Sequence, residues 1–406
     1  MFINENLGIT APVGFLASGI HCGLKKNQSK NDLALIYSEV LANAAAVYTK
    51  NKVKGAPLIV TKNNLVDSQA QAIIINSGNA NTCTGDDGFN KALVMTTYTA
   101  KNLDIKPTNV LVASTGVIGV PLDINKISLG IPHLTSSLSK KNFTSSAKAI
   151  MTTDTIIKQC AITTEIKGKK ITIGAMAKGS GMIHPNMATM LSFITTDLSI
   201  SKTLLQEALT ESVNLSYNRI SVDGDSSTND MVIILANVLA KNPTISKKDK
   251  DYDEFVNALN LLNINLSKKI AKDGEGATKL IECTVENMLS EHDAEILSKS
   301  VVSSSLVKAA IFGSDANWGR ILCALGYSDI NFNPNSVDVS FISEAGSILV
   351  CENGLPVDFD EIFAKKILLE NEIKILINMK IGFKSATTWG CDLTYDYVRI
   401  NGDYRS

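Results

Sequence analysis

One segment of the chain combines a hydroxyl side chain with the irregular backbone that self-cleavage chemistry needs. The stretch KGSGMIHPNMATML, residues 178–191, contains two glycines, a proline and a histidine, and leads into the apolar run LSFITTD. When a chain cleaves itself just before a threonine, the exposed α-amine, with a pKa near ~8, becomes the base for that residue's own hydroxyl. Ala188-Thr189 is therefore a candidate cleavage site and nucleophile, although an Ala-Thr pair at the start of a strand, taken alone, is more often structural.

Other common sources of catalytic chemistry are missing from the sequence. No Lys-Ser or Lys-Thr follows the second glycine of this segment, as a phosphate loop requires, and Ser180 has Lys178 and Met182 where a nucleophile elbow has glycines. No histidine pair has metal-ligand spacing, and the seven cysteines contain no CxxC pair. Dispersed thiols of odd number are typical of a reducing compartment, so we expect a cytoplasmic protein. Because no histidine pair has metal-ligand spacing, we expect no bound metal.

Composition and charge exclude several classes of protein. The 406 residues are 45% hydrophobic and 19% charged, with a net charge of −1, so no global field favours nucleic acid or an anionic membrane. The longest apolar run, MVIILANVLA, is far shorter than the ~20 residues that span a bilayer. The first residues lack the basic and apolar regions of a signal peptide. The length favours two domains.

Apolar β-rich runs recur along most of the chain and alternate with helical patterns. Several runs are apolar throughout, which predicts strands covered on both faces. The expected strands are 33–40, 44–49, 56–61, 72–78, 109–115, 160–166, 169–177, 190–197 and 231–238, and the expected helices are 87–103, 201–218 and 254–272. Ser201 is the expected N-cap of the second helix. This alternation predicts a layered α/β protein with helices on the outer faces of sheets.

The pattern of predicted strands and helices changes after Cys283. Strands are expected at 337–342, 347–352 and 372–379, around one helix at 359–371. We therefore place a larger α/β domain at residues 1–283 and a smaller one at 284–406.

Four further stretches have both a functional and a structural interpretation. Thr115-Gly116 ends a predicted strand, where it can form an oxyanion hole or simply a turn. The amide-rich loop at 76–88 either lines a polar site or turns the chain through hydrogen bonds to the backbone. SVDGDSSTND, residues 221–230, lacks the glycine position and terminal glutamate of a calcium loop, which favours caps and turns. Glu275 either faces water or orients a substrate ammonium.

Taken together, these stretches resemble one family. INSGNANTCTG, STGVIG, MTTDT, KGSGMIHPNMATML, DGDSSTND, KDGEGATK, FGSDANWGRI and the ending YVRINGDYRS are similar to motifs of the glutamate N-acetyltransferase/ornithine acetyltransferase family of arginine biosynthesis. The likeness runs nearly end to end. It implies a self-cleaving αββα sandwich of the N-terminal-nucleophile type, in which residues 1–283 form the catalytic domain and 284–406 complete the active site.

The resemblance also assigns roles to individual residues. It implies cleavage between Ala188 and Thr189, after which Thr189 takes acetyl from N-acetylornithine and passes it to glutamate. Thr115 and Gly116 match the oxyanion hole of the family. The positions that match its substrate-binding residues are Thr152, Lys178, Thr189, Glu275, Asn401 and Ser406. Thr82 and Ser406 depart mildly from the family pattern, where alanine and threonine are common.

The resemblance further implies a heterotetramer of two α chains, residues 1–188, and two β chains, residues 189–406. The implied partners are N-acetylornithine and glutamate, with no nucleic acid, membrane, metal or cofactor. Whether acetyl-CoA is a second acetyl donor stays open. An aminopeptidase or amidase of the same fold, with water as acceptor, is the nearest alternative. A non-enzymatic binding module would leave the chain uncut.

Overall fold

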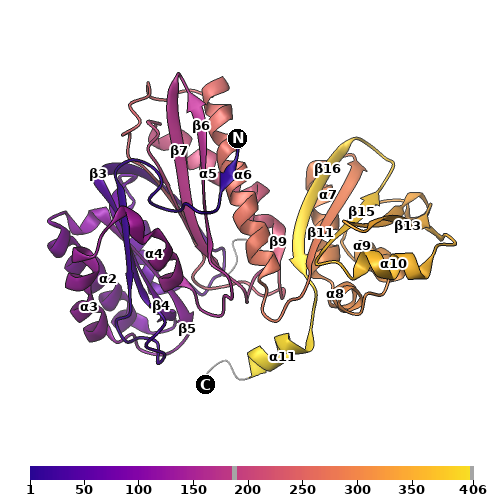
Figure 1. Ribbon diagram of the computed structural model, residues 1–406, viewed down its shortest axis with the longest axis horizontal. Coiled ribbons are helices and arrows are strands. Elements are labelled where there is room, and N and C mark those ends of the chain that lie inside the picture. The colour runs from indigo at the N-terminus through magenta and orange to yellow at the C-terminus, as the bar shows by residue number, and fades with distance from the viewer. Residues whose placement is uncertain (185–189, 403–406) are drawn as a thin grey trace. The chain divides into compact units, whose positions relative to one another are not determined.

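The computed structural model describes residues 1–184 and 190–402 (Figure 1). It consists of two compact units: Met1–Gly179, Asn186–Asn218 and Ser226–Leu266 form the first, and Ser180–Pro185, Arg219–Asp225 and Ser267–Ser406 form the second. The boundary expected at 283/284 falls inside strand β11, Leu280–Met288, which is hydrogen-bonded to a strand on each side. The two units therefore divide earlier, within helix α6, Lys250–Lys272.

The described residues of the first unit form one mixed sheet of nine strands. Its order is β1-β6-β7-β8-β10-β3-β4-β5, with β2 paired to β3. The strands are β1 Ile3–Asn4, β2 Phe15–Ile20, β3 Leu33–Tyr48, β4 Gln69–Asn79, β5 Val110–Val117, β6 Lys158–Ile166, β7 Lys169–Lys178, β8 Leu191–Thr196 and β10 Met231–Ala236. The two runs expected at 33–40 and 44–49 are thus one long strand.

Helices cover this sheet. They are α1 Ala56–Asn64, α2 Gly85–Leu103, α3 Ile124–Ser136, α4 Phe143–Ile150, α5 Lys202–Leu215 and the first part of α6. Ser201 caps α5 as predicted, because its side chain accepts a hydrogen bond from the Leu204 N–H at 3.4 Å. The Thr164 hydroxyl of β6 donates to Glu254 of α6 at 2.6 Å, which ties that helix to its edge of the sheet.

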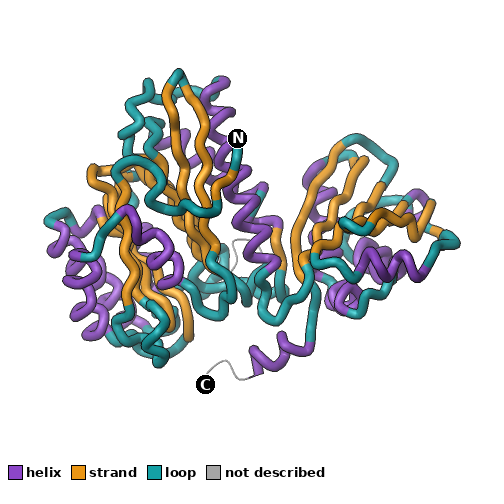
Figure 2. Tube along the Cα trace, viewed as in Figure 1, coloured by secondary structure: helices purple, strands orange, loops and turns teal. Residues whose placement is uncertain are grey.

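Strand β3 passes from one layer of the first unit to another. Its first part pairs with β2 and β4, its last part pairs with β10, and its pairing with β4 changes register between Tyr37 and Ala42. Alternate side chains enter two cores: Leu33 packs with residues of α2 and α3, and Ala34 packs in the cluster that contains Phe193 of β8. Two β layers with helices outside them result, which confirms the expected αββα sandwich (Figure 2).

Residues 56–61, predicted as a strand, instead begin helix α1. Gly55 is the N-cap and Pro57 lies in the first turn, where the missing N–H of proline costs no hydrogen bond. The helix packs on β5, and the Thr61 hydroxyl bonds both the carbonyl and the N–H of Val112, at 2.7 and 2.8 Å. The prediction was wrong because a short buried helix and a buried strand are both apolar throughout.

The described residues of the second unit form a seven-stranded sheet in the order β14-β13-β12-β15-β11-β16-β9. Besides β11, the strands are β9 Ile220–Ser221, β12 Asp338–Ser343, β13 Gly346–Glu352, β14 Leu355–Pro356, β15 Glu372–Asn378 and β16 Lys384–Cys391. The helices are α7 Glu291–Ser303, α8 Ser305–Phe312, α9 Trp318–Gly326, α10 Glu361–Leu368 and α11 Tyr395–Gly402. The helix expected at 359–371 is α10, and the other four were not predicted from the sequence, because most of them span only about two turns and show too little periodicity.

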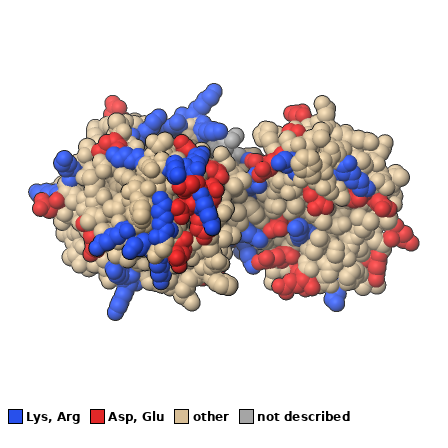
Figure 3. All heavy atoms as spheres, turned by 90° about the horizontal axis from the view of Figure 1, so that it is seen from above, with Lys and Arg blue, Asp and Glu red and all other residues tan. Residues whose placement is uncertain are grey.

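The surface of the first unit carries charges of both signs. On the face shown in Figure 3, basic and acidic side chains are interspersed over this unit. Pairs such as Lys248 with Glu207, 2.8 Å apart, cancel charge locally. No helix in residues 1–184 and 190–402 is long and apolar enough to span a bilayer.

Candidate active site

The end of strand β5 packs Thr115 and Gly116 tightly against strand β4. Gly116 has a φ of +133°, and a Cβ at this position would lie 2.4 Å from the carbonyl carbon of Gly78. Only glycine fits such an approach. Thr115 is 4% exposed. Packing alone accounts for this glycine, and the oxyanion role of the pair stays a prediction.

Side-chain amides of β4 and of the segment before β10 hold this strand end and the amide-rich loop through hydrogen bonds to backbone carbonyls. The Asn76 amide donates to the Asn79 carbonyl at 2.9 Å. The Asn229 amide donates to the carbonyls of Ala80 and Ser114, at 2.6 and 2.9 Å. These contacts favour the interpretation that the loop turns and fixes the chain. Their effect is to immobilise the backbone that leads directly into Thr115.

Lys178, the last residue of β7, brings predicted site residues together. Its Nζ lies 2.8 Å from the Thr152 hydroxyl and 3.4 Å from the Thr115 hydroxyl. The lysine is only 3% exposed. The hydroxyls of Thr115 and Thr152, which are far from Lys178 in the sequence, thus meet at its buried ammonium. A cation flanked by hydroxyls is suited to bind a carboxylate through charge-assisted hydrogen bonds.

A carboxylate that the sequence analysis did not single out supports this group. Asp154 accepts hydrogen bonds from Lys158 Nζ at 2.8 Å and from the Gly179 N–H at 2.7 Å, and its other oxygen is 4.0 Å from Lys178 Nζ. Burial raises the pKa of Asp154, but the charges of Lys178 and Lys158 outweigh burial and hold that pKa below its ordinary value. Asp154 therefore stays ionised. The only signal for it in the sequence was its place in the motif MTTDT.

The segment with the predicted cleavage site leaves the sheet and returns to it at the same point. Lys178 at the end of β7 pairs with Leu191 at the start of β8. The Met190 N–H donates to the Asp230 carboxylate at 3.0 Å, and burial raises the pKa of Asp230 well above its ordinary value. The predicted cleavage residues Ala188 and Thr189 lie outside the described residues, as does Ser406.

In the second unit, the predicted site residues Glu275 and Asn401 are bonded to each other. The Asn401 amide donates to the Glu275 carboxylate at 2.8 Å, and the Glu275 N–H donates to the Ser180 carbonyl at 2.8 Å. A Cβ on Gly181 would lie 2.3 Å from the Glu275 carboxyl carbon. Glu275 is 8% exposed, so it packs against the residues before the predicted cleavage site rather than facing water. Asn401 lies within helix α11 and is therefore not part of a frayed C-terminal tail.

Asp223 holds the same segment through its backbone. The carboxylate accepts the N–H groups of Met182 and Ile183, at 2.5 and 2.8 Å, and the Val222 N–H donates to the Ile183 carbonyl at 2.6 Å. Burial raises the pKa of Asp223 against these hydrogen bonds. The contacts agree with the turn-forming role expected for residues 221–230.

Within the described ranges, no three His, Cys, Asp or Glu residues are placed to hold a metal ion.

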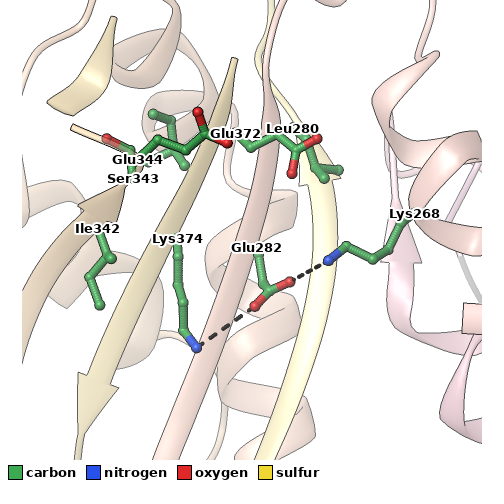
Figure 4. A pocket seen from close by; sticks show the side chains of 9 residues that line it. Lys268, Leu280, Glu282, Ile342, Ser343, Glu344, Glu372 and Lys374 are labelled. Atoms are coloured by element: carbon green, nitrogen blue, oxygen red, sulfur yellow. Dashed lines mark hydrogen bonds and ion pairs between the residues drawn. The ribbon is translucent and has the colours of Figure 1, made fainter. Parts of the chain in front are cut away.

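A second charged group lines a groove of about 210 Å³ on the sheet of the second unit (Figure 4). Glu282 of β11 accepts hydrogen bonds from Lys268 Nζ and the Trp389 indole, both at 2.9 Å, and lies 3.7 Å from Lys374 Nζ. These charges satisfy one another, and none of the predicted site residues lines the groove. We assign it no catalytic role.

Comparison with known proteins identifies the family. A model described as the ArgJ family matches residues 16–406. The chain is 54% identical over 402 residues to the arginine biosynthesis bifunctional protein ArgJ 1 of Clostridium acetobutylicum, covering 99% of this chain and 98% of that protein. It is 53% identical over 398 residues to the ArgJ protein of Caldanaerobacter subterraneus, covering 98% of each. The crystal structure of the Bacillus halodurans argJ protein is 47% identical with a TM-score of 0.51, covering 53% of this chain and 99% of that chain.

The family match spans every motif quoted above, from INSGNANTCTG to YVRINGDYRS. It confirms the resemblance drawn from those motifs and, with it, the assignment as an acetyltransferase of arginine biosynthesis. From its sequence motifs and from relatives matched over almost their whole length, the chain belongs to the ArgJ family.

Proposed function

We propose that the protein transfers acetyl from N-acetylornithine to glutamate through an acetyl ester on Thr189. The observation that carries this proposal is the buried Lys178 ammonium, which lies beside the hydroxyls of Thr152 and Thr115. N-acetylornithine and glutamate each carry an α-carboxylate, so one cation can hold the two substrates in turn. Because both share that cation, ornithine leaves before glutamate binds.

The transfer has two steps with Thr189 as the carrier. In the first, the neutral α-amine of Thr189 takes the hydroxyl proton while Oγ bonds to the acetyl carbon. The C–N bond to ornithine breaks and the proton passes to the leaving nitrogen. In the second step, the neutral amine of glutamate attacks the ester, the C–Oγ bond breaks, and the proton lost by the attacking nitrogen passes by way of the Thr189 α-amine to Oγ.

The other residues assigned by the resemblance bind and stabilise. An amide is a poor acyl donor, so stabilisation of the oxyanion by Thr115 and Gly116 has to contribute on the order of several kcal/mol. Glu275, oriented by Asn401, binds the side-chain ammonium of ornithine, and Ser406 contributes its hydroxyl to substrate binding.

We further propose that the chain cleaves itself between Ala188 and Thr189. This leaves a second chain of 406 minus 188, or 218, residues. The matched Bacillus halodurans chain covers 53% of this chain, or about 215 residues, which supports a product of this length. Two copies of each product then form a heterotetramer in the cytoplasm.

Cleavage is tested by replacing the nucleophile. The wild-type protein should give two fragments on a denaturing gel, the larger beginning at Thr189. Thr189→Ala should stay a single chain of 43.6 kDa because no hydroxyl remains to attack. Thr189→Ser, the matched control, keeps a hydroxyl and should still cleave. Efficient cleavage of Thr189→Ala would assign the nucleophile to another residue.

Transfer is tested by supplying the donor without the acceptor. Incubation with N-acetylornithine alone should add one acetyl group to the 189–406 fragment, detected by mass spectrometry. Glutamate should then remove it and yield N-acetylglutamate. Release of free acetate at the same rate with and without glutamate would support the alternative, an amidase of the same fold. Absence of the acetylated fragment together with intersecting double-reciprocal lines would contradict the covalent route.

A further inference from the structure

The first unit contains a cavity of about 650 Å³ that begins at the candidate site. Thr152, whose hydroxyl bonds Lys178, is part of its wall, and so is the preceding residue, Met151. A third residue of the wall, Lys25, comes from the loop between β2 and β3 and precedes every motif of the predicted site in the sequence. The volume is in the range of small-molecule sites, so the cavity has room for an amino acid.

The side chain of Lys25 is held along its whole length. Its stem crosses strand β4: a Cβ on Gly78 would lie 3.3 Å from Lys25 Cγ, and Gly78 is paired with Gly116 of the predicted oxyanion hole. Its Nζ donates to the carbonyls of Asn31 and Met151, at 2.7 and 2.8 Å. The ammonium is therefore fixed at the cavity wall and does not sweep through solvent like the head of a surface lysine.

A buried carboxylate holds the loop that carries this lysine. Asp32 is fully buried and accepts the backbone N–H groups of Cys22, Gly23 and Lys25, at 2.6, 3.2 and 2.9 Å. Its oxygens are thus bonded to the backbone of the loop. The direction in which the Lys25 side chain leaves the loop is therefore set before a ligand binds, which lowers the entropy cost of binding.

Lys25 and Lys178 bond neighbouring residues of the cavity wall. Lys25 Nζ contacts the Met151 carbonyl and Lys178 Nζ contacts the Thr152 hydroxyl, each at 2.8 Å. Burial lowers the pKa of Lys25 to about 8, and the charge of Lys178 adds to the decrease although Asp32 acts against it. Two like charges in such proximity favour the binding of an anion that contacts both.

The carboxylates of the first unit do not balance this positive charge. The acceptors of Lys25 Nζ within the described ranges are two neutral carbonyls. Asp154, also in the cavity wall, is already bonded to Lys158 and to the N–H groups of Thr152 and Gly179. An ammonium has three N–H groups, so one N–H of Lys25 remains for a ligand in the cavity.

We propose that Lys25 binds the side-chain carboxylate of the acceptor glutamate, and so selects a dicarboxylic amino acid. Glutamate carries two carboxylates separated by three carbon atoms, and Lys178 takes the first of them. Consecutive Cα atoms are about 3.8 Å apart, so cations that bond adjacent residues have a spacing on the scale of these two carboxylates. Each carboxylate then gains a charge-assisted hydrogen bond. The inference rests on the acetyl transfer proposed above and names the residue that recognises its acceptor.

Lys25 also distinguishes glutamate from the product that leaves. Ornithine carries an ammonium at the end of its side chain, which Lys25 repels and the carboxylate of Glu275 attracts. Glutamate and ornithine compete for the acetylated enzyme, so this repulsion favours capture of acetyl by glutamate over its return to ornithine. Glutamine has the shape of glutamate without the second charge, and it therefore lacks the charge-assisted bond to Lys25.

The test compares two variants that each remove one ammonium from the cavity wall. Lys25→Met removes the fixed charge, and Lys148→Met, the matched control, removes an exposed charge of helix α4. In a ping-pong reaction, kcat/KM for each substrate reports its own half of the exchange. We expect Lys25→Met to lower kcat/KM for glutamate about tenfold or more, the factor of one charge-assisted hydrogen bond. It should lower kcat/KM for N-acetylornithine less than about twofold, and Lys148→Met should resemble the wild type with both substrates.

A comparison of acceptors separates recognition from a general structural loss. The wild type should use glutamate about tenfold or more better than glutamine. Lys25→Met should bring this ratio close to one by lowering the rate with glutamate alone. An equal loss for glutamate, glutamine and N-acetylornithine would mean that Lys25 only supports the fold beside Thr152, and would overturn the proposal. A loss of the preference for glutamate in Lys148→Met, with Lys25→Met unaffected, would overturn it as well.

Binding of glutarate separates this inference from the proposed function. Glutarate has the two carboxylates of glutamate at the same spacing but no amine, so it binds without accepting acetyl. Calorimetric titration should show that Lys25→Met weakens glutarate binding about tenfold and that Lys148→Met does not. If exchange is absent but glutarate binding depends on Lys25, the proposed function fails and the dicarboxylate site stands. If exchange occurs and neither glutarate binding nor the preference for glutamate depends on Lys25, this inference fails and the exchange function stands.

Discussion

Asp154 in the first unit and Glu282 in the second are each held between two lysines, but they differ in burial. The Asp154 carboxylate is 2.8 Å from Lys158 and 4.0 Å from Lys178, and all three side chains are at most 3% exposed. The Glu282 carboxylate is 2.9 Å from Lys268 and 3.7 Å from Lys374, and these side chains are 24–38% exposed (Figure 4). The distances are nearly the same, so burial is the variable.

Burial determines how strongly the carboxylate and the two lysines of each group interact. Around Glu282, water solvates each group, so the pair interactions are weak. Around Asp154, desolvation makes each unpaired charge costly, and the group is stable only when complete. The buried group also lies beside predicted site residues, because Lys178 contacts the hydroxyls of Thr152 and Thr115. The group around Glu282 contacts none of the predicted site residues that the structure describes.

The largest expected effect that separates the two groups is on stability. Asp154→Asn keeps the shape but removes the buried negative charge that lies between the ammonium groups of Lys158 and Lys178. We expect the free energy of unfolding to fall by about 3–5 kcal/mol, measured by urea denaturation. Acetyl transfer should fall with it, because Lys178 loses the same partner.

The double variant Asp154→Asn with Lys158→Met is the matched control. It also removes the buried positive charge of Lys158, so a large part of the lost stability should return. A loss of less than about 1 kcal/mol for Asp154→Asn alone would mean that the buried group behaves like the exposed one, and the comparison would fail.

The second difference is in pH dependence. For both carboxyls the folded-state pKa is below its ordinary value, because lysine charges and hydrogen bonds outweigh the raising effect of burial. Each therefore stabilises the fold above its unfolded-state pKa, about 3.9 for Asp and 4.3 for Glu, and that contribution is lost as pH falls through the folded pKa.

The measurement is urea unfolding of wild type, Asp154→Asn and Glu282→Gln across a pH series. The difference between wild type and Asp154→Asn should be constant from pH 7 to about 5 and shrink below about 4. Glu282→Gln should show the same sign with a smaller amplitude, since its charges are screened by water. A difference that grows on acidification would mean that Asp154 is protonated in the folded protein.

The smallest expected effect is that of Glu282→Gln at neutral pH. The exposed network should contribute about 1 kcal/mol or less to stability. In 1 M salt the Debye length falls to about 3 Å, so even this loss should nearly vanish. The loss caused by Asp154→Asn should not change with salt, because salt does not enter a buried group. Salt sensitivity of the Asp154 variant, measured in the same assay, would contradict its burial.

The sequence alone determined the family and most of the strands. Local patterns carry that information: apolar runs such as 72–78 and 231–238 are strands in any well-packed sheet, and Ser201 caps a helix through its own neighbours. The motifs around residues 115, 178 and 275 identified the family because they match its motifs residue by residue. Short helices in the second unit and helix α1 were missed because tertiary burial, not local periodicity, determines them.

Only the tertiary structure decided how those residues work together. Apart from the family resemblance, nothing in the sequence relates Thr115, Thr152 and Lys178, because 63 residues separate the first from the last. Contacts across such distances depend on where the folded sheet places β5 and β7. The same holds for Asp154, an ordinary aspartate in the sequence, which the charges of two lysines keep ionised despite its burial. Residue types specify which chemistry is available. Packing determines which polar and charged groups are desolvated and therefore have to form hydrogen bonds or ion pairs with one another.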